Sequence, residues 1–166
     1  VIALSNSKKM LLNNEHIELD NWKEQLDKSS VNADREVFFN HIKTLNLRNS
    51  IFVDNTANEK IANEYGRYLA HNIGVVTCNK IACASSLRNY NDLKKTARRF
   101  GTPFLFETNV GAGLPVIDTL NNLIASGDKI LKIQAILSGS LNFVFNNFTR
   151  ETPFKDIVQK AQEEGY

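Results

Sequence analysis

Short apolar runs alternate with longer stretches of helical periodicity through the first two thirds of the chain. Runs at residues 1–4, 51–53, 75–76 and 104–106 have the length and composition of buried strands. The stretches between them repeat apolar residues every three or four positions, which indicates amphipathic helices. Because strands that alternate with helices are typical of parallel sheets, the pattern predicts an α/β fold with a parallel sheet.

Three stretches predict separate helices, and two of these helices have a recognisable end. The stretch Leu19–Leu26 predicts a short helix that contains Trp22, the only tryptophan. Asp34 suits the N-cap of a second helix, because its side chain can accept a hydrogen bond from a first-turn N–H. A third helix should end at Gly101, just before a proline that cannot continue it. The apolar faces would comprise Phe38, Ile42 and Leu45 in the second helix and Leu93, Ala97 and Phe100 in the third.

The residues after the strand at 51–53 predict one continuous helix. Thr56 and Glu59 stand at the spacing of a capping box. An apolar stripe follows over residues 57–69, and Gly74 stands where a helix commonly ends in the left-handed conformation. Thr56 is therefore predicted at a helix N-terminus, where backbone N–H groups and the helix dipole favour a phosphate or another polar ligand.

The pattern changes after residue 107. Residues 111–115, Gly-Ala-Gly-Leu-Pro, predict a tight turn whose proline begins a helix. Residues 126–128 then predict the turn that follows this helix.

The last forty residues predict one strand and two helices. Apolar residues alternate with polar ones over 131–137, as in a half-buried strand. Residues 138–140 should lead into a helix, and Pro153 should open a last helix that ends at Gly165. The chain is therefore expected to close with a second α/β segment.

Composition excludes several classes of protein. Twenty Lys and Arg against 18 Asp and Glu give a net charge of +2, too small for a general electrostatic nucleic-acid binder. No apolar run approaches the roughly 18 residues of a membrane span, and we expect no signal peptide. Cys78 and Cys83, the only cysteines, favour neither a disulfide framework nor a zinc site. We expect a cytoplasmic protein, and the missing initiator methionine indicates a segment of a longer one.

Polar side chains follow three successive predicted strands. Thr56, Lys80 and Glu107 each come after the end of one of them. Right-handed crossovers bring the carboxyl ends of parallel strands to one edge, where ligands of open α/β sheets bind. Each residue alone could be an ordinary turn residue. Together they predict a cofactor crevice, in which Lys80 supplies a fixed positive charge.

The segment after the first strand has the chemistry of a phosphate site. Asn6, Ser7 and Lys8 offer amide, hydroxyl and ammonium groups. These groups suit the 2′-phosphate of NADP, whereas an acidic residue would suit the free ribose hydroxyl of NAD. However, no G-x-G-x-x-G sequence follows any predicted strand, so this chain lacks the phosphate-binding loop of a dinucleotide site.

Glu107 and the Gly-rich turn after it suggest a cation site. One carboxylate and several inward-turned carbonyls form an all-oxygen site, and the low charge suits a monovalent ion. The alternative is a tight strand-to-helix turn without a ligand, and composition alone favours that alternative.

Five segments, in order and at the right spacing, resemble one family. They are DNT at 54–56, VVTCNK at 75–80, TNVGAGLPVI at 108–117, SGD at 126–128 and ILSGSLN at 136–142. The family is homoserine dehydrogenase, and the resemblance covers essentially the whole chain. The opening residues and the segment around Trp22 are most similar to the dehydrogenase half of bifunctional aspartokinase–homoserine dehydrogenases.

The resemblance implies a reaction and a fold. The reaction is the interconversion of L-aspartate 4-semialdehyde and L-homoserine with NADPH or NADH, carried out on a Rossmann-like parallel sheet by a homodimer or higher homo-oligomer. Thr56 and Lys80 match residues of the cofactor crevice, with Lys80 also close to the substrate. Gly165 matches a position near both.

The resemblance also implies a monovalent-cation site, normally occupied by sodium. Its ligands would be the side chain of Glu107 and the main-chain carbonyls of Val110, Ala112 and Leu114.

Residues 1–107 would form a partial NAD(P)-binding domain, and residues 108–166 the start of a substrate-binding and dimerisation domain. Cys78 stands where the family usually has proline, a change expected to alter only the loop. The family's Gly-rich loop would precede Val1 and its proton-donating lysine would follow Tyr166, so the chain alone is expected to be inactive. The alternatives are another nicotinamide-dependent dehydrogenase and a non-catalytic Rossmann-like module for dimerisation or regulation.

Overall fold

The computed structural model describes all residues from 1 to 166. The chain divides into two compact units, Val1–Asn109 and Val110–Tyr166. None of its helices is long and apolar enough to cross a lipid bilayer.

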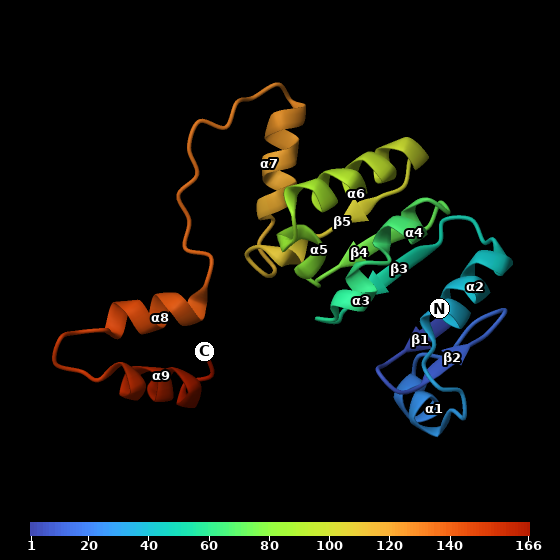
Figure 1. The fold of residues 1–166 in the computed structure, drawn as a ribbon, viewed down its shortest axis with the longest axis horizontal. Helices are drawn as coiled ribbons and strands as arrows, with labels where there is room; N and C mark the ends of the chain where they lie inside the picture. Colours follow the sequence, from blue (N-terminus) through green and yellow to red (C-terminus); the bar gives the residue numbers. More distant parts are fainter. The chain divides into compact units, whose positions relative to one another are not determined.

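A parallel sheet forms the centre of the first unit. Its strands are β3 (Ile51–Asp54), β4 (Gly74–Thr77) and β5 (Phe104–Leu105), in the order β3-β4-β5. Val76 is the partner of Val53 on one side and of Leu105 on the other. The predicted α/β fold with a parallel sheet is confirmed (Figure 1).

Helices cover one face of this sheet. They are α2 (Arg35–Leu45), α3 (Glu59–Ala62), α4 (Tyr65–Leu69), α5 (Ile81–Ala84) and α6 (Leu87–Phe100). Helices α4 and α6 pack against each other and against neighbouring strands (Figure 1). The core beneath them includes Phe39, Tyr65, Leu69 and Val75, while Ile51, Val53 and Leu105 stay more than half exposed.

Two predicted helix ends are confirmed. The Asp34 carboxylate accepts a hydrogen bond from the Val37 N–H at 2.9 Å and so caps α2. Gly101, at φ +61°, ends α6 in the left-handed conformation, which glycine adopts without steric cost.

The predicted continuous helix over residues 57–69 is wrong. It is broken into α3 and α4, and α3 is capped by Asn58, whose side chain accepts hydrogen bonds from two N–H groups. The capping role expected of Thr56 is therefore also wrong. Asn72, at φ +58°, takes the left-handed position expected for Gly74. Gly74 instead lies in β4, where a Cβ would come within 2.9 Å of the Pro103 ring.

An antiparallel hairpin precedes the parallel sheet. It consists of β1 (Ala3–Ser5) and β2 (Met10–Leu12) and is followed by α1 (Trp22–Lys28). A strand near residues 1–4 is confirmed, but it belongs to a separate two-stranded sheet rather than to the parallel one. The helix expected over Leu19–Leu26 begins three residues later, at Trp22.

The second unit is helical. It contains α7 (Val116–Ala125), α8 (Gly139–Asn147) and α9 (Phe154–Glu163). Helices α8 and α9 pack through Val144, Ile157 and Ala161. As predicted, Pro115 precedes α7, Pro153 precedes α9, and Gly165 follows α9 with a positive φ.

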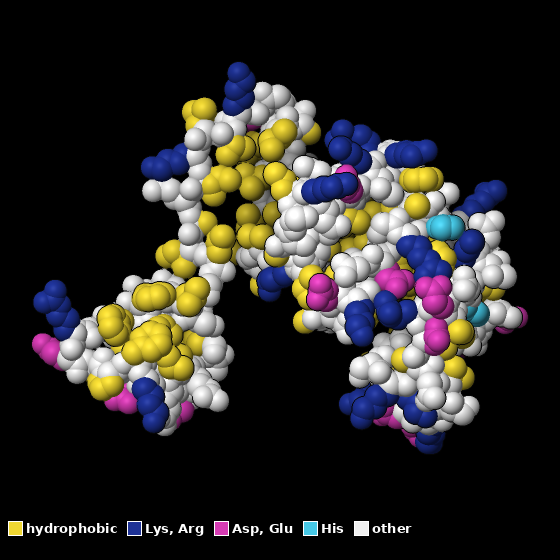
Figure 2. Space-filling model, in the orientation of Figure 1, with side chains coloured by type: hydrophobic (Ala, Val, Ile, Leu, Met, Phe, Trp, Pro, Cys, Tyr) yellow, Lys and Arg dark blue, Asp and Glu magenta, His cyan; other side chains and the backbone are white.

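The predicted strand over residues 131–137 is not formed. Leu131 and Leu137 are 93% and 67% exposed, and no residue of this segment pairs with another strand. A strand satisfies its backbone groups only through a neighbour, and no other strand lies in this unit. Figure 2 shows further exposed hydrophobic side chains on the lobe of α8 and α9, where Leu141 and Phe145 are more than half exposed.

The cap of α2 predicts a stability difference between two variants. Asp34→Ala should lower the free energy of unfolding by about 1 kcal/mol, because the Val37 N–H loses its acceptor. Asp34→Asn should stay close to the unaltered protein, since asparagine caps helices equally well. Urea unfolding followed by circular dichroism measures both, and equal stability of the alanine and asparagine variants would contradict the capping role.

Candidate functional site

The carboxyl edge of the parallel sheet carries the residues that the sequence singled out. Thr56 follows β3, Lys80 follows β4, and Glu107 opens a 3-10 helix, η1 (Glu107–Asn109), after β5. Because the three strands are parallel and adjacent, their carboxyl ends lie at the same edge. The structure therefore brings these residues to one side of the sheet.

A buried carboxylate organises this edge. Asp54, the last residue of β3, is 1% exposed. Its Oδ1 accepts a hydrogen bond from the Thr56 N–H at 2.8 Å. Its Oδ2 accepts one from the Tyr65 hydroxyl at 2.5 Å and one from Asn79 Nδ2 at 3.0 Å. The carboxylate thus joins the end of β3 to α4 and to the loop after β4.

Asn79 connects the loops after β3 and β4. Its Nδ2 also donates to the Asn58 carbonyl at 3.1 Å, while its Oδ1 accepts from the Ile81 N–H at 3.1 Å. Its main-chain carbonyl accepts a long hydrogen bond, 3.4 Å, from Asn109 Nδ2. One buried residue, through its side chain and its main-chain carbonyl, therefore links segments that follow all three strands.

Tyr65 is a neutral hydrogen-bond donor in this network. Burial and the hydrogen bond to Asp54 raise the pKa of its hydroxyl far above its usual value. The hydroxyl oxygen also lies 2.7 Å from Thr77 Oγ1, which in turn accepts from the Asn79 N–H at 2.9 Å. Tyr65 therefore keeps its proton, and the Asp54 carboxylate keeps a donor, throughout the physiological range.

Thr56 and Lys80 face outward from this buried network. Both residues are exposed. The Thr56 Oγ1 accepts a hydrogen bond from the Asn58 N–H at 3.1 Å, so its hydroxyl hydrogen is directed elsewhere. The Thr56 N–H, which was expected to serve a ligand, is already bonded to Asp54. Thr56 can offer a ligand its hydroxyl, and Lys80 its exposed ammonium.

The residues proposed for the 2′-phosphate lie on a different sheet. Asn6, Ser7 and Lys8 form the turn between β1 and β2 and are exposed. The Asn6 Oδ1 accepts hydrogen bonds from the N–H groups of Lys8 and Lys9, both at 2.8 Å. The Asn6 amide oxygen therefore builds the turn, whereas the ends of Ser7 and Lys8 remain accessible to solvent.

The residues of the expected cation site are divided between the units. Glu107 lies in the first, whereas Val110, Ala112, Leu114 and also Gly165 lie in the second. The main chain of the Gly-rich turn is locally constrained: Ala112 has φ +52°, and the Leu114 carbonyl accepts from the Val116 N–H at 2.9 Å.

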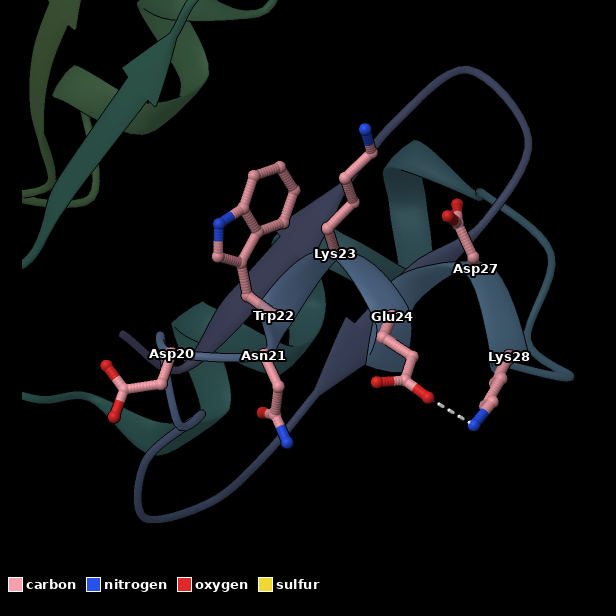
Figure 3. A pocket seen from close by; sticks show the side chains of 7 residues that line it. All are labelled: Asp20, Asn21, Trp22, Lys23, Glu24, Asp27 and Lys28. Carbon is pink, nitrogen blue, oxygen red and sulfur yellow. Dashed lines mark hydrogen bonds and ion pairs between the residues drawn. The ribbon is translucent and has the colours of Figure 1, made fainter.

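Two surface hollows lie away from this edge. One lies along α1 and the residues just before it, and is lined by Asp20, Asn21, Trp22, Lys23, Glu24, Asp27 and Lys28 (Figure 3). Its side chains point in different directions and Lys28 pairs with Glu24 (Figure 3). The other lies at the amino ends of the strands, beside Ile51 and Gly74. Neither hollow contains a residue of the strand-end network.

Sequence reasoning missed Tyr65 and the buried roles of Asp54 and Asn79. Tyr65 falls within the apolar stripe predicted over residues 57–69, and its ring does pack in the core, with its centroid 6.0 Å from that of Phe104. Asp54 directly follows the predicted strand at 51–53, and Asn79 lies three residues after the one at 75–76. A polar residue so close to the end of a buried strand was the signal that could have found them.

Comparison with protein families identifies the chain. Residues 3–107 match the family model described as the NAD-binding domain of homoserine dehydrogenase. Residues 115–166 match the family model of homoserine dehydrogenase. The chain belongs to the homoserine dehydrogenase family.

Bifunctional relatives match this chain along its whole length. A bifunctional aspartokinase/homoserine dehydrogenase from Haemophilus influenzae is 40% identical over 166 residues, which are 100% of this chain and 20% of that protein. A chloroplastic counterpart from Zea mays is also 40% identical, over 167 residues and 18% of its length. A homoserine dehydrogenase from Schizosaccharomyces pombe is 42% identical over 122 residues, 70% of this chain and 32% of its own. The chain thus spans about a fifth of the length of its bifunctional relatives.

Solved structures support the same fold. A Candida auris protein described as being of unknown function has a TM-score of 0.88 and 33% identity, covering 100% of this chain and 48% of that one. A hyperthermophilic archaeal homoserine dehydrogenase in complex with NADPH has a TM-score of 0.76 and 23% identity, covering 99% of this chain and 51% of that one. The Rossmann-like architecture of the first unit agrees with this likeness.

The raised pKa of Tyr65 leads us to expect a loss of protein stability at high pH. The pKa of its hydroxyl is raised in the folded protein, by burial first and by Asp54 second, whereas in the unfolded chain it is about 10. The stabilisation is fully present below that pH and is lost as the pH rises, because only the unfolded state then releases the proton. The free energy of unfolding should fall by up to about 1.4 kcal/mol per pH unit for this residue.

The Tyr65→Phe variant isolates this contribution, because other groups titrate equally in both proteins. Urea unfolding at several pH values above 9 should give a shallower pH dependence for the variant, and identical slopes would contradict the assignment.

Proposed function

We propose that the protein carrying this chain interconverts L-aspartate 4-semialdehyde and L-homoserine with a nicotinamide cofactor. The observation that carries the proposal is the family match over residues 3–107, which contain the strand-end edge with Thr56 and Lys80. In open α/β sheets, ligands bind beyond the carboxyl ends of the strands. This edge is therefore the place for the cofactor.

The residues at this edge fit such a cofactor. Lys80 is exposed and its ammonium has no carboxylate partner, so it can attract phosphate or a developing negative charge. The Thr56 hydroxyl can donate to a polar group of the ligand, and the buried Asp54 holds the main chain beneath it. A bound nicotinamide cofactor supplies the hydride that reduces the aldehyde carbon to the alcohol.

NADP is the cofactor we favour over NAD. The accessible Ser7 hydroxyl and Lys8 ammonium would contact the 2′-phosphate, and Asn6 would shape the turn that presents them. A matched pair of titrations with NADPH and NADH measures this preference. Lys8→Glu should reverse it, because an acidic residue repels phosphate and suits the free hydroxyl.

A monovalent cation, sodium, would bind to the Glu107 carboxylate and to the carbonyls of Val110, Ala112 and Leu114. Such an oxygen-only set suits a hard ion. The Leu114 carbonyl already accepts one hydrogen bond but keeps a second lone pair. Gly165 would lie near the cofactor and substrate.

The two parts of the chain would have different functions. Residues 1–107 would bind the cofactor, and residues 108–166 would contribute to substrate binding and to a homodimer. Exposed apolar side chains support self-association, among them Leu131 and Ile136 in the unpaired segment and Phe145 on α8.

The alternative is a non-catalytic Rossmann-like module for dimerisation or regulation. The absence of a G-x-G-x-x-G loop within these residues favours it for the chain in isolation. Residues 1–166 alone should accordingly show no turnover of the semialdehyde, because the chain also lacks the proton-donating lysine implied by the resemblance. Turnover by the isolated chain would contradict this expectation.

Lys80 provides the direct test of the proposed reaction. In the full-length protein, Lys80→Ala should lower kcat/KM for aspartate semialdehyde by about tenfold or more, as expected for loss of a contact to a charged group. Consumption of NADPH, followed by its absorbance, measures the rate.

Lys95→Ala is the matched control, since Lys95 is an exposed lysine of α6 away from the strand ends. Equal rates for the Lys80 variant and the unaltered protein would contradict the role of Lys80. No turnover by the unaltered protein would favour the non-catalytic alternative.

A further inference from the structure

Three polar side chains point inward beside the three residues that mark the carboxyl edge. Asp54 stands two residues before Thr56, Asn79 one residue before Lys80, and Asn109 two residues after Glu107. Asp54 and Asn79 are 1% and 2% exposed, although both are strongly polar. Burying such groups is costly unless they are hydrogen-bonded, so their partners indicate what they do.

Several hydrogen-bond partners of Asp54 and Asn79 are main-chain groups in the loops that carry Thr56 and Lys80. Asp54 accepts from the Thr56 N–H, and Asn79 contacts the Asn58 carbonyl and the Ile81 N–H. The first of these groups belongs to Thr56 itself, the second lies two residues after Thr56, and the third lies one residue after Lys80. The buried network therefore holds the main chain that presents both outward-facing side chains.

The Asn79 side-chain amide joins the two loops directly. Its Nδ2 donates to Asp54 Oδ2 at 3.0 Å and to the Asn58 carbonyl at 3.1 Å, so the end of β3 and the loop after it are both bonded to the loop after β4. The Tyr65 hydroxyl supports both sides of it, at 2.5 Å from Asp54 Oδ2 and 2.7 Å from Thr77 Oγ1. Movement of either loop would cost hydrogen bonds in the other.

We propose that Asp54, Tyr65 and Asn79 are positioning residues that lock the Thr56 and Lys80 loops into one unit for cofactor binding. The proposal rests on the proposed function. None of the three touches the cofactor; they act through the main chain of the residues that do. A cluster that served stability alone would leave loop order and cofactor affinity unchanged in a folded variant.

Tyr65→Phe tests the proposal in the full-length protein. The substitution removes one hydroxyl and keeps the ring that packs against Phe52 and Phe104. Tyr68→Phe is the matched control, because Tyr68 lies on the same helix and is 3% exposed but belongs to no part of the network.

Two readouts are measured at a temperature at which all variants are folded. Hydrogen exchange of residues 55–58 and 78–81 should become about tenfold faster in Tyr65→Phe, and the Kd for NADPH should rise about tenfold, as expected when a buried acceptor loses its donor. Residues 87–100 of α6 should exchange as before. Unchanged loop exchange, or an equal effect of Tyr68→Phe, would overturn the proposal.

Asp54→Asn provides a second test should Tyr65→Phe fail to fold. Asparagine has the size of aspartate but one acceptor oxygen in place of two, so it can serve the Thr56 N–H or the Asn79 amide, not both. Exchange should therefore rise in one of the two loops and NADPH should bind more weakly. Protection of both loops as in the unaltered protein would overturn the proposal.

The unaltered protein separates this inference from the proposed function. If it does not bind NADPH, the proposed function fails, whatever the variants do. If it binds NADPH and the variants bind it equally well, the proposed function stands and the positioning role is overturned.

Discussion

The Asp54 carboxylate is buried and accepts three hydrogen bonds, and the carboxyl edge of the sheet depends on that arrangement. A carboxylate removed from water is stable only with such donors. Each donor comes from a different segment. They are the main-chain N–H of Thr56 after β3, the Tyr65 hydroxyl on α4, and the side-chain amide of Asn79 after β4. Satisfying one buried group therefore fixes the relative positions of three segments, and Thr56 and Lys80 are exposed on two of them.

This arrangement explains how a polar ligand site can stand on an apolar core. The Tyr65 ring packs with Phe52 and Phe104, while its hydroxyl reaches Asp54. The same residue thus belongs to the core and to the site. Burial and the bond to Asp54 raise the pKa of that hydroxyl, so it remains a hydrogen-bond donor in the physiological range. Residues 3–107 match the NAD-binding domain of the family, and we propose that the nicotinamide cofactor binds at this edge.

Local periodicity predicted the elements whose ends are set by local chemistry. The parallel strands, the Asp34 cap and the Gly101 end of α6 depend on residues close in sequence, and these predictions are confirmed. The meeting of Thr56, Lys80 and Glu107 at one edge could also be predicted, since strand direction alone brings the strand ends together. The roles of Asp54 and Tyr65 could not be predicted, because their hydrogen bond joins residues on different elements. A tyrosine on an apolar helix face also resembles an ordinary core residue.

Two errors have a common physical cause. The alternating residues 131–137 predicted a strand, but a strand needs a partner and this unit supplies none. Thr56 was predicted to cap a helix, yet its N–H is bonded to Asp54 and Asn58 takes the cap. In both cases the local pattern describes the residue types correctly but carries no information about partners in three dimensions. The strand at 131–137 has no partner strand, and Thr56 competes with Asn58 for the cap.

The most direct test of this account is hydrogen exchange of the full-length protein with and without NADPH. Protection should appear at residues 55–58 and 78–81, beyond the carboxyl ends of β3 and β4. The hollow at the amino ends of the strands, around residues 46–51 and 71–74, should be unaffected. Protection at that opposite edge, or at neither, would contradict the assignment of the cofactor site to the edge built on Asp54.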